Sequence, residues 1–237
     1  MKQVSVIIPT LWRSDLTVSL LQALLKWEFL KELIIIDNAP DSRPNHHCMS
    51  QCIILEQKKN IYVNPAWNLG VHHSSGNVVA ICNDDIVFEP QKLNACIQKL
   101  KFNEVIGLHE DSILNSQNIT QTEVRDGFNI GLGWGCLMLM KRSSYIHIPP
   151  SIKIWYGDDW IVHCTGIKKS IRIPVMGTLS VSASDPKFNP TKVQDKAEYE
   201  AVIWHPIYRG LRILCRLGFK TPFKIAMNRR AQVGLNF

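Results

Sequence analysis

The sequence of 237 residues lacks any apolar run that approaches the ~18 residues needed to span a bilayer. Before Pro9 it carries one lysine and only the short apolar stretch 4–8, which is too short for the apolar core of a signal peptide. Internal repeats, low-complexity tracts and linkers are also missing from the first 205 residues. We therefore expect a globular protein that neither spans a membrane nor carries a recognisable export signal.

The cysteine pattern offers no disulfide framework. The seven cysteines are odd in number and lie mostly within apolar runs, where a thiol behaves as a small hydrophobic side chain. The cluster 46–52 (HHCMSQC) lacks a second ligand pair at zinc-like spacing, so we interpret it as a loop that leads into a strand at 52–56. This pattern indicates a reduced, cytosolic compartment.

Acidic residues are absent from 206–237, and this segment accounts for the entire net charge of +7. Subtracting its seven basic residues from 27 leaves 20 basic against 20 acidic residues in the first 205. We therefore expect a neutral domain at 1–205 and a cationic tail at 206–237. The basic residues of the tail are Arg209, Arg212, Arg216, Lys220, Lys224, Arg229 and Arg230.

The tail interleaves apolar residues such as Ile207, Leu211 and Leu214 with these cations. A basic amphipathic helix of this kind is typical of one that lies on an anionic membrane surface. The alternative is a terminal helix that packs on the domain with its basic face in solvent. We expect no nucleic-acid partner, because the sequence contains no recognition module for one.

Short apolar runs alternate with helical patterns through the first hundred residues, which predicts a doubly wound α/β sheet with right-handed crossovers. After residue 104 this alternation is replaced by strands separated by longer polar stretches. The expected strands are 4–8, 33–37, 52–56, 78–82, 105–108, 135–140 and 171–175, and the expected helices start at Ser14, Asn64 and Pro90 and after the stretch 154–160.

Polar residues follow four of these strands and are expected to meet at one edge of the sheet, where parallel sheets bind ligands. These exits are Pro9 with Thr10, Asp37 with Asn38, Asn60 with Asn68, and Asn83 with Asp84 and Asp85. Two adjacent carboxylates at a strand end suit a divalent cation that carries a phosphorylated substrate. Single residues of these types are also common in turns and helix caps.

Taken together, the motifs resemble those of the GT-A glycosyltransferases, particularly the inverting family 2, over residues 3–176. The matching pieces are VSVIIPT at 4–10, IIIDNA at 34–39, the Asn-rich 60–76, CNDDIVF at 82–88, GWGCLMLMKR at 133–142 and YGDDW at 156–160. The resemblance implies a Rossmann-like GT-A fold, with a mostly parallel central sheet flanked by helices. It also implies a nucleotide-sugar donor.

For the donor, the resemblance implies that Pro9 and Thr10 shape the nucleotide-base pocket with their backbone groups. Asp37 would accept a hydrogen bond from the base, and Asn60 and Asn68 would bind the ribose and diphosphate. Many relatives have a glycine at 63 or 64, where this chain has Val63 and Asn64, so this loop is expected to differ in shape.

For the metal, the resemblance implies that Asp85 binds Mn²⁺ or Mg²⁺, while Asn83 faces the ribose or sugar and Asp84 supports the site. Many relatives also place a metal-binding histidine after the late strand, but 178–186 contains none. Either another residue replaces that histidine, or diphosphate and water complete the ligand set. The candidate replacements are His163, His205 and Asp185.

For the acceptor, the resemblance implies that Asp159 is the general base and that Asp158 positions the acceptor. If the alignment slips by one residue, Asp158 is the base. Trp134, Trp155 and Trp160 surround this motif, and at least one is expected to stack on the acceptor sugar, whereas the alternative for each is a place in the core.

The sequence therefore predicts an inverting enzyme that transfers a hexose, from UDP as the expected carrier, to a hydroxyl of a glycan or lipid-linked glycan acceptor. The expected setting is bacterial surface polysaccharide synthesis, of the lipopolysaccharide O-antigen or core or of the capsule, at the inner face of the cell membrane. One alternative is a catalytically inactive sugar- or nucleotide-binding module of the same fold. A sugar nucleotidyltransferase would need a Gly-rich, basic loop after its first strand, and 9–15 (PTLWRSD) is not one.

Overall fold

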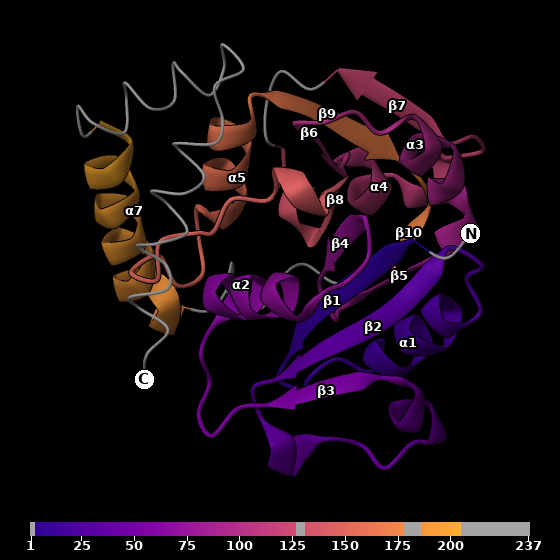
Figure 1. The fold of residues 1–237 in the computed structure, drawn as a ribbon, viewed down its shortest axis with the longest axis horizontal. Helices are drawn as coiled ribbons and strands as arrows, with labels where there is room; N and C mark the ends of the chain where they lie inside the picture. Colours follow the sequence, from indigo (N-terminus) through magenta and orange to yellow (C-terminus); the bar gives the residue numbers. More distant parts are fainter. Residues whose placement is uncertain (1–2, 127–130, 178–185, 205–237) are drawn as a thin grey trace.

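The computed structural model describes residues 3–126, 131–177 and 186–204, and its main feature is an eight-stranded sheet in the order β3-β2-β1-β4-β8-β6-β9-β7 (Figure 1). Its strands are β1 (Val4–Thr10), β2 (Leu30–Asp37), β3 (Ile53–Glu56), β4 (Val78–Cys82), β6 (Glu104–Leu108), β7 (Glu123–Asp126), β8 (Leu137–Lys141) and β9 (Ile167–Arg172). A separate two-stranded sheet pairs β5 (Ile86–Phe88) with β10 (Val175–Gly177).

Six α-helices connect or flank these strands in the described residues, together with short 3-10 turns. The helices are α1 (Thr17–Leu25), α2 (Val63–His73), α3 (Asn94–Lys99), α4 (Asp111–Leu114), α5 (Gly157–Thr165) and α7 (Asn189–Trp204). The 3-10 turns are Pro40–Ser42, His47–Gln51, Pro90–Leu93, Ser116–Asn118, Trp134–Cys136, Arg142–Ser144 and Pro186–Phe188.

The first half of the sheet is parallel. β1 pairs with both β2 and β4, and β2 pairs with β3, all in parallel. Thr10 is opposite Asp37, and Asp37 is opposite Glu56, so the carboxyl ends of these strands lie at one edge. Every residue of β1 and β4 is buried, as expected for strands covered on both faces.

The second half of the sheet contains the reversed strand β8, which is antiparallel to both β4 and β6. Cys82, at the end of β4, is opposite Leu137, at the start of β8. The turn that precedes β8 therefore lies beside the residues that follow β4. This reversal brings the segment 134–136 to the same edge of the sheet as Asn83, Asp84 and Asp85.

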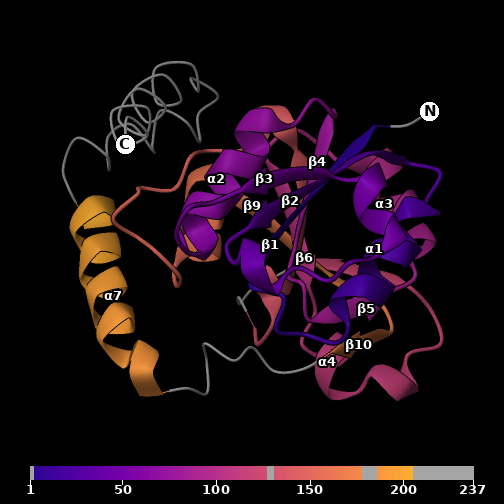
Figure 2. The same ribbon diagram turned by 90° about the horizontal axis from the view of Figure 1, so that it is seen from below.

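Two apolar layers cover the sheet. Leu20, Leu21 and Leu24 of α1 pack with one face, and Ala66 of α2 and Ile161 of α5 belong to the core on the other face. Gly70 allows α2 to approach β1 closely, because an added Cβ would lie 2.3 Å from Ile7 Cγ2. Figures 1 and 2 show α7 on the side of the molecule where α2 and α5 lie, and its Tyr199, Val202 and Ile203 join the core on that face.

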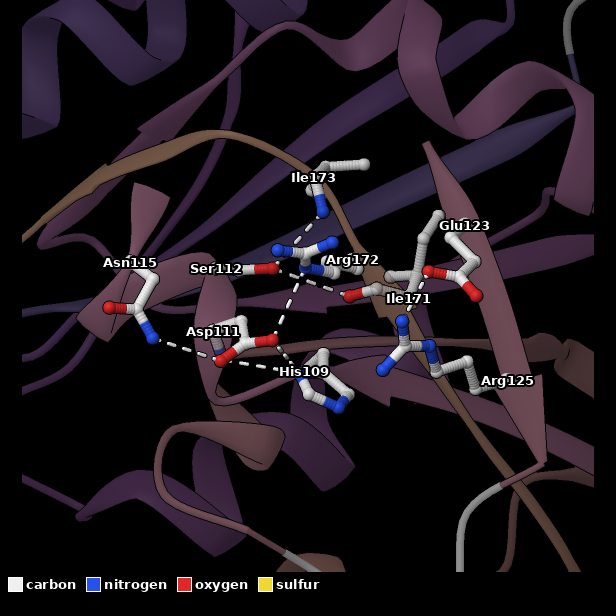
Figure 3. A network of polar contacts seen from close by, with 9 residues as sticks. All are labelled: His109, Asp111, Ser112, Asn115, Glu123, Arg125, Ile171, Arg172 and Ile173. Carbon is white, nitrogen blue, oxygen red and sulfur yellow. Dashed lines mark hydrogen bonds and ion pairs between the residues drawn. The ribbon is translucent and has the colours of Figure 1, made fainter. Parts of the chain in front are cut away.

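A polar network ties α4 to β9 at the other end of the sheet (Figure 3). Arg172 Nε lies 3.2 Å from Asp111 Oδ2, and Ser112 Oγ accepts a hydrogen bond from Ile173 N at 3.1 Å. Arg125 pairs with Glu123 at 2.6 Å on the exposed edge strand β7. None of these residues is among those that line the cleft described below, and we interpret the network as structural.

Several expected boundaries shift by a few residues. The first helix starts at Thr17, with Ser14 Oγ accepting from Leu16 N at 3.2 Å, and Asn64 lies inside α2 rather than at its cap. The strand expected at 135–140 is β8, preceded by the turn Trp134–Cys136. No helix in the described ranges combines the length and apolar character needed to cross a bilayer. The predicted tail, 206–237, lies outside the described residues.

Candidate active site

A cleft of about 680 Å³ opens at the carboxyl ends of β1 and β4. Of the residues predicted to bind donor or metal, it is lined by Pro9, Thr10, Asn60, Asn83, Asp84 and Asp85. Asp37 and Asn68 are not among its lining residues. The edge predicted from the polar strand exits therefore does carry a cavity of the size of a small-molecule site.

Asp84 is held by the turn that follows β1. Thr10 Oγ1 donates to Asp84 Oδ2 at 2.5 Å and accepts from Trp12 N at 2.8 Å. Burial raises the pKa of Asp84 to about 6, with Thr10 acting against this rise and the nearby charge of Asp85 adding to it. The Thr10 side chain is thus occupied by Asp84, which suits the supporting role predicted for this carboxylate.

Asp85 is half-buried and lines the cleft beside Asp84. The two adjacent carboxylates offer hard oxygen donors, which fit Mg²⁺ or Mn²⁺. In the ranges that the structure describes, no group of three or more His, Cys, Asp and Glu side chains surrounds a possible metal position. Asp85 is the residue of this pair that the sequence assigns to the metal.

Of the candidate replacements for the missing metal-binding histidine, only His163 lies in the described residues. His163 lies in the last turn of α5 and belongs to no cluster of possible metal ligands. Asp185 and His205 lie outside the described residues.

Asn83 joins the end of β4 to the turn before β8. Its backbone N donates to Cys136 O at 2.9 Å, and its Nδ2 lies 3.4 Å from Cys136 Sγ. Burial raises the pKa of the Cys136 thiol to about 12, and the charges of Asp85 and Asp158 reinforce this rise. Cys136 is therefore a neutral thiol that lies within electrostatic reach of both acidic motifs.

Asp158 and Asp159 lie in the first turn of α5. A Cβ added to Gly135 would lie 2.7 Å from Asp158 Oδ2, so this carboxylate rests against the turn that precedes β8. Burial raises the pKa of Asp158 to about 6, and the neighbouring Asp159 adds to the rise. Burial also raises the pKa of Asp159, while Lys168 acts in the opposite direction.

The structure corrects the role predicted for Asp37. Its side chain is fully buried, and Oδ1 accepts from Trp12 Nε1 at 2.8 Å and from Ala39 N at 3.1 Å. Arg43 lies 3.3 Å from Oδ2. The carboxylate thus fixes the loops that follow β1 and β2, and its neighbour Asn38 lines the cleft instead.

The two predicted asparagines differ. Asn60 is exposed at the cleft, and its Oδ1 accepts from Tyr62 N at 2.8 Å in a local turn. Asn68 is buried, so its predicted role at the donor is wrong: Oδ1 accepts from Tyr145 Oη and Ile148 N, and Nδ2 donates to Ile148 O. Asn68 thus connects α2 to the segment 145–148 inside the core.

Two of the three predicted acceptor-lining tryptophans are core residues. Trp134 is buried with its Nε1 donating to Lys169 O at 3.2 Å, and Trp160 is buried with its Nε1 donating to His147 O at 3.0 Å. Trp155 is partly exposed, and its ring meets that of the cleft residue Phe188 edge to face at 6.3 Å. Only Trp155 of the three therefore keeps a position suited to an acceptor sugar.

Sequence reasoning missed several residues that line the cleft, among them Arg13, Tyr62, Ile154, Met176 and Phe188. Arg13 is exposed and follows Thr10, the end of the first polar exit, by three residues. Its position in the sequence could therefore have predicted its place at the cleft. The others come from parts of the chain that tertiary packing alone brings to the cleft.

Comparison with solved structures identifies the fold as that of the GT-A glycosyltransferases. S. aureus TarS (fragment 1–349) matches with a TM-score of 0.55 and 14% identity, over 94% of this chain and 72% of that one. GalNAc-T7, in a structure with UDP, GalNAc and Mn²⁺, matches with a TM-score of 0.60 and 14% identity, over 92% of this chain and 52% of that one. A TarS complex with UDP-GlcNAc matches with a TM-score of 0.56 and 12% identity, over 92% and 71%.

The sequence model of glycosyl transferase family 2 matches residues 5–148, more than half of the chain. The chain therefore belongs to glycosyl transferase family 2, and both the predicted fold and the predicted family are confirmed. A search of curated protein sequences found no significant match.

Proposed function

We propose that this glycosyltransferase transfers a hexose from a nucleotide sugar, with UDP as the carrier, to a hydroxyl of a glycan acceptor and inverts the anomeric centre. The observation that carries the proposal is that the turn Trp134–Cys136 contacts both acidic motifs. Asn83, which precedes the two cleft carboxylates, donates through its backbone N to Cys136 O at 2.9 Å. Asp158 Oδ2, at the start of α5, would lie 2.7 Å from a Cβ added to Gly135. One motif suits the donor phosphates, and the other suits the acceptor hydroxyl.

The donor side of the proposal is supported by the cleft residues and by the ligands of similar structures. TarS has been crystallised with UDP and with UDP-GlcNAc, and GalNAc-T7 with UDP, GalNAc and Mn²⁺. In this chain, Pro9 and Asn38 would border the nucleotide, and the exposed Arg13 would approach the diphosphate. Mn²⁺ or Mg²⁺ held by Asp85 would offset the charge that develops on the departing diphosphate.

On the acceptor side, we assign Asp159 as the general base and Asp158 as the residue that positions the acceptor. The acceptor oxygen attacks the anomeric carbon, and its proton passes to a carboxylate oxygen of Asp159. The bond to the diphosphate breaks on the opposite face, so the nucleoside diphosphate leaves with the electron pair and the configuration inverts. A pKa raised by burial brings such a carboxylate closer to neutral pH, where it is a more effective base.

We place the enzyme at the inner face of a bacterial cell membrane, where it would extend a lipid-linked glycan of lipopolysaccharide or capsule. The support is the sequence of 206–237, whose seven cations and interleaved apolar residues suit an anionic lipid surface. The domain and tail would then divide near residue 205.

A thermal-unfolding screen of nucleotide sugars with Mn²⁺ tests the donor class. A ligand at a hundredfold excess over its dissociation constant adds about 2.7 kcal/mol of stability, so the correct donor should stand out. Slow release of free sugar from that donor without acceptor separates an active transferase from an inactive binding module. Pyrophosphate release from a nucleoside triphosphate and a sugar phosphate would instead indicate a nucleotidyltransferase.

A further inference from the structure

The segment 153–155, which leads into the motif of Asp158 and Asp159, is bound by one buried carboxylate. Asp195 of α7 is fully buried. Its Oδ1 accepts from Lys153 N at 2.9 Å, and its Oδ2 accepts from Ile154 N at 2.8 Å and from Trp155 N at 3.0 Å. Three consecutive main-chain donors are thus held by a side chain about forty residues further along the chain.

The carbonyl groups around this segment are bound by a second helix. Asn64 of α2 donates through Nδ2 to Ile152 O at 3.2 Å and to Trp155 O at 3.1 Å. A Cβ added to Gly157 would lie only 2.0 Å from Asn64 Oδ1, so the glycine allows this close approach. The segment is therefore bound by both α2 and α7: α7 accepts from its N–H groups, and α2 donates to its carbonyl groups.

Aromatic contacts also connect this segment to α7 and to the residue that precedes it. Tyr156 has a φ of 62°, in the left-handed region that a residue with a side chain rarely adopts, so the surroundings must stabilise it. Its ring stacks on Tyr199 of α7, with 5.2 Å between ring centroids. Trp155 contacts Phe188, which precedes α7 and lines the cleft. The left-handed residue lies directly before Gly157, the first residue of α5.

We propose that Asp195 is a positioning residue that fixes the turn before α5 and, through it, the acceptor side of the active site. This inference rests on the proposed function, because it assumes that the first turn of α5 carries the base. Asp195 is not among the residues that line the cleft, so it acts through the segment 153–156. Without its carboxylate, the turn should lose its fixed position while the nucleotide-binding edge at β1 and β4 keeps its shape.

The test compares Asp195→Asn and Asp195→Ala with Glu200→Gln, a matched change of an exposed carboxylate that pairs with Lys196 on the same helix at 3.9 Å. For both Asp195 variants we expect the kcat of transfer to fall about tenfold or more, while the KM for donor stays within about twofold. Amide exchange at 153–155 should accelerate about tenfold or more, without a matching change in β1 or β4. Glu200→Gln should behave like the wild type.

Each result decides the proposal. Wild-type transfer and wild-type exchange at 153–155 in Asp195→Asn would overturn it, as would an equal loss of donor affinity and turnover. If both Asp195 variants fail to fold, the residue is a stability element and the positioning role is wrong. If the wild type transfers sugar from no nucleotide donor, the proposed function fails and Asp195 has no acceptor side to position, while the exchange data still report whether it holds the segment.

Discussion

Gly135 and Asp158 lie so close together that a Cβ on the glycine would stand 2.7 Å from Asp158 Oδ2. This contact fixes Asp158 against the turn that precedes β8. Asp159 is one residue further along α5, about 100° round the helix. The charge of Lys168 opposes the rise that burial causes in the pKa of Asp159. The two acidic residues therefore have different surroundings, and substitution should separate their roles.

We predict that Asp159→Asn retains donor binding and loses turnover, because the amide preserves the shape but cannot accept the acceptor's proton. The expected loss is about a hundredfold or more, the usual contribution of a general base. Asp158→Asn should have a smaller effect, seen mainly in the KM for acceptor. Steady-state kinetics with both substrates varied distinguishes the cases: the reverse order of severity assigns the base to Asp158, and wild-type rates in both variants exclude both residues.

We predict that Asp85→Ala abolishes transfer but leaves the fold intact, because the side chain faces the cleft rather than the core. Loss of a metal ligand should remove several kcal/mol of transition-state stabilisation, roughly a hundredfold or more in rate. The Mn²⁺-dependent rise in melting temperature of the wild type should also disappear. Asp15→Ala, at an exposed residue of the same cleft, should retain that rise. Full activity of the wild type in EDTA would rule out a metal at Asp85.

How far the sequence predicted the site depends on what each residue contacts. Asn83, Asp84 and Asp85 line the cleft because they follow a buried parallel strand, and such strands end at the binding edge of the sheet, while their roles stay predictions. Asp37 ends its strand at the same edge, yet Trp12 and Arg43 occupy its carboxylate. Neither partner can be inferred from strand order, since both come from loops whose shape depends on tertiary packing.

The acceptor side was harder to predict for a similar reason. Asn68 and Trp160 have the right residue types for sugar binding, but both face the core and use their polar atoms to bond main-chain groups. Trp155, in contrast, is partly exposed, and its ring contacts the cleft residue Phe188. The sequence did not indicate the role of Asp195, because its three hydrogen-bond partners lie about forty residues away. Local periodicity does not predict contacts of that kind.

We predict a pH-dependent stability that reflects Asp84 and Asp158. Burial raises the pKa of each to about 6 from 3.8, so the folded protein binds more protons than the unfolded chain between these values. The free energy of unfolding should therefore fall as pH rises from about 4 to about 6 through these groups. Asp158→Asn removes one of these two contributions. Its free energy of unfolding at pH 7.5 should therefore be about 1 kcal/mol higher than that of the wild type, a value reduced because the side chain is partly exposed to solvent.

Urea unfolding of both proteins between pH 4 and 8, in the absence of divalent cations, checks this expectation. The difference in the free energy of unfolding should shrink toward pH 4, where the wild-type carboxyl is protonated. Two parallel curves would show that Asp158 titrates as an ordinary exposed carboxyl.

The last prediction concerns the cationic segment 206–237. Because seven cations contribute roughly 1 kcal/mol each near an anionic bilayer, the full chain should sediment with anionic liposomes and be released by high salt. A chain that ends at Trp204 retains α7 and its buried Ile203, so it should stay folded and active on a water-soluble acceptor while losing liposome binding. Neutral liposomes serve as the control. Unfolding of the truncated chain, or failure of the full chain to bind anionic liposomes at low salt, would instead make the tail part of the core or of a protein interface.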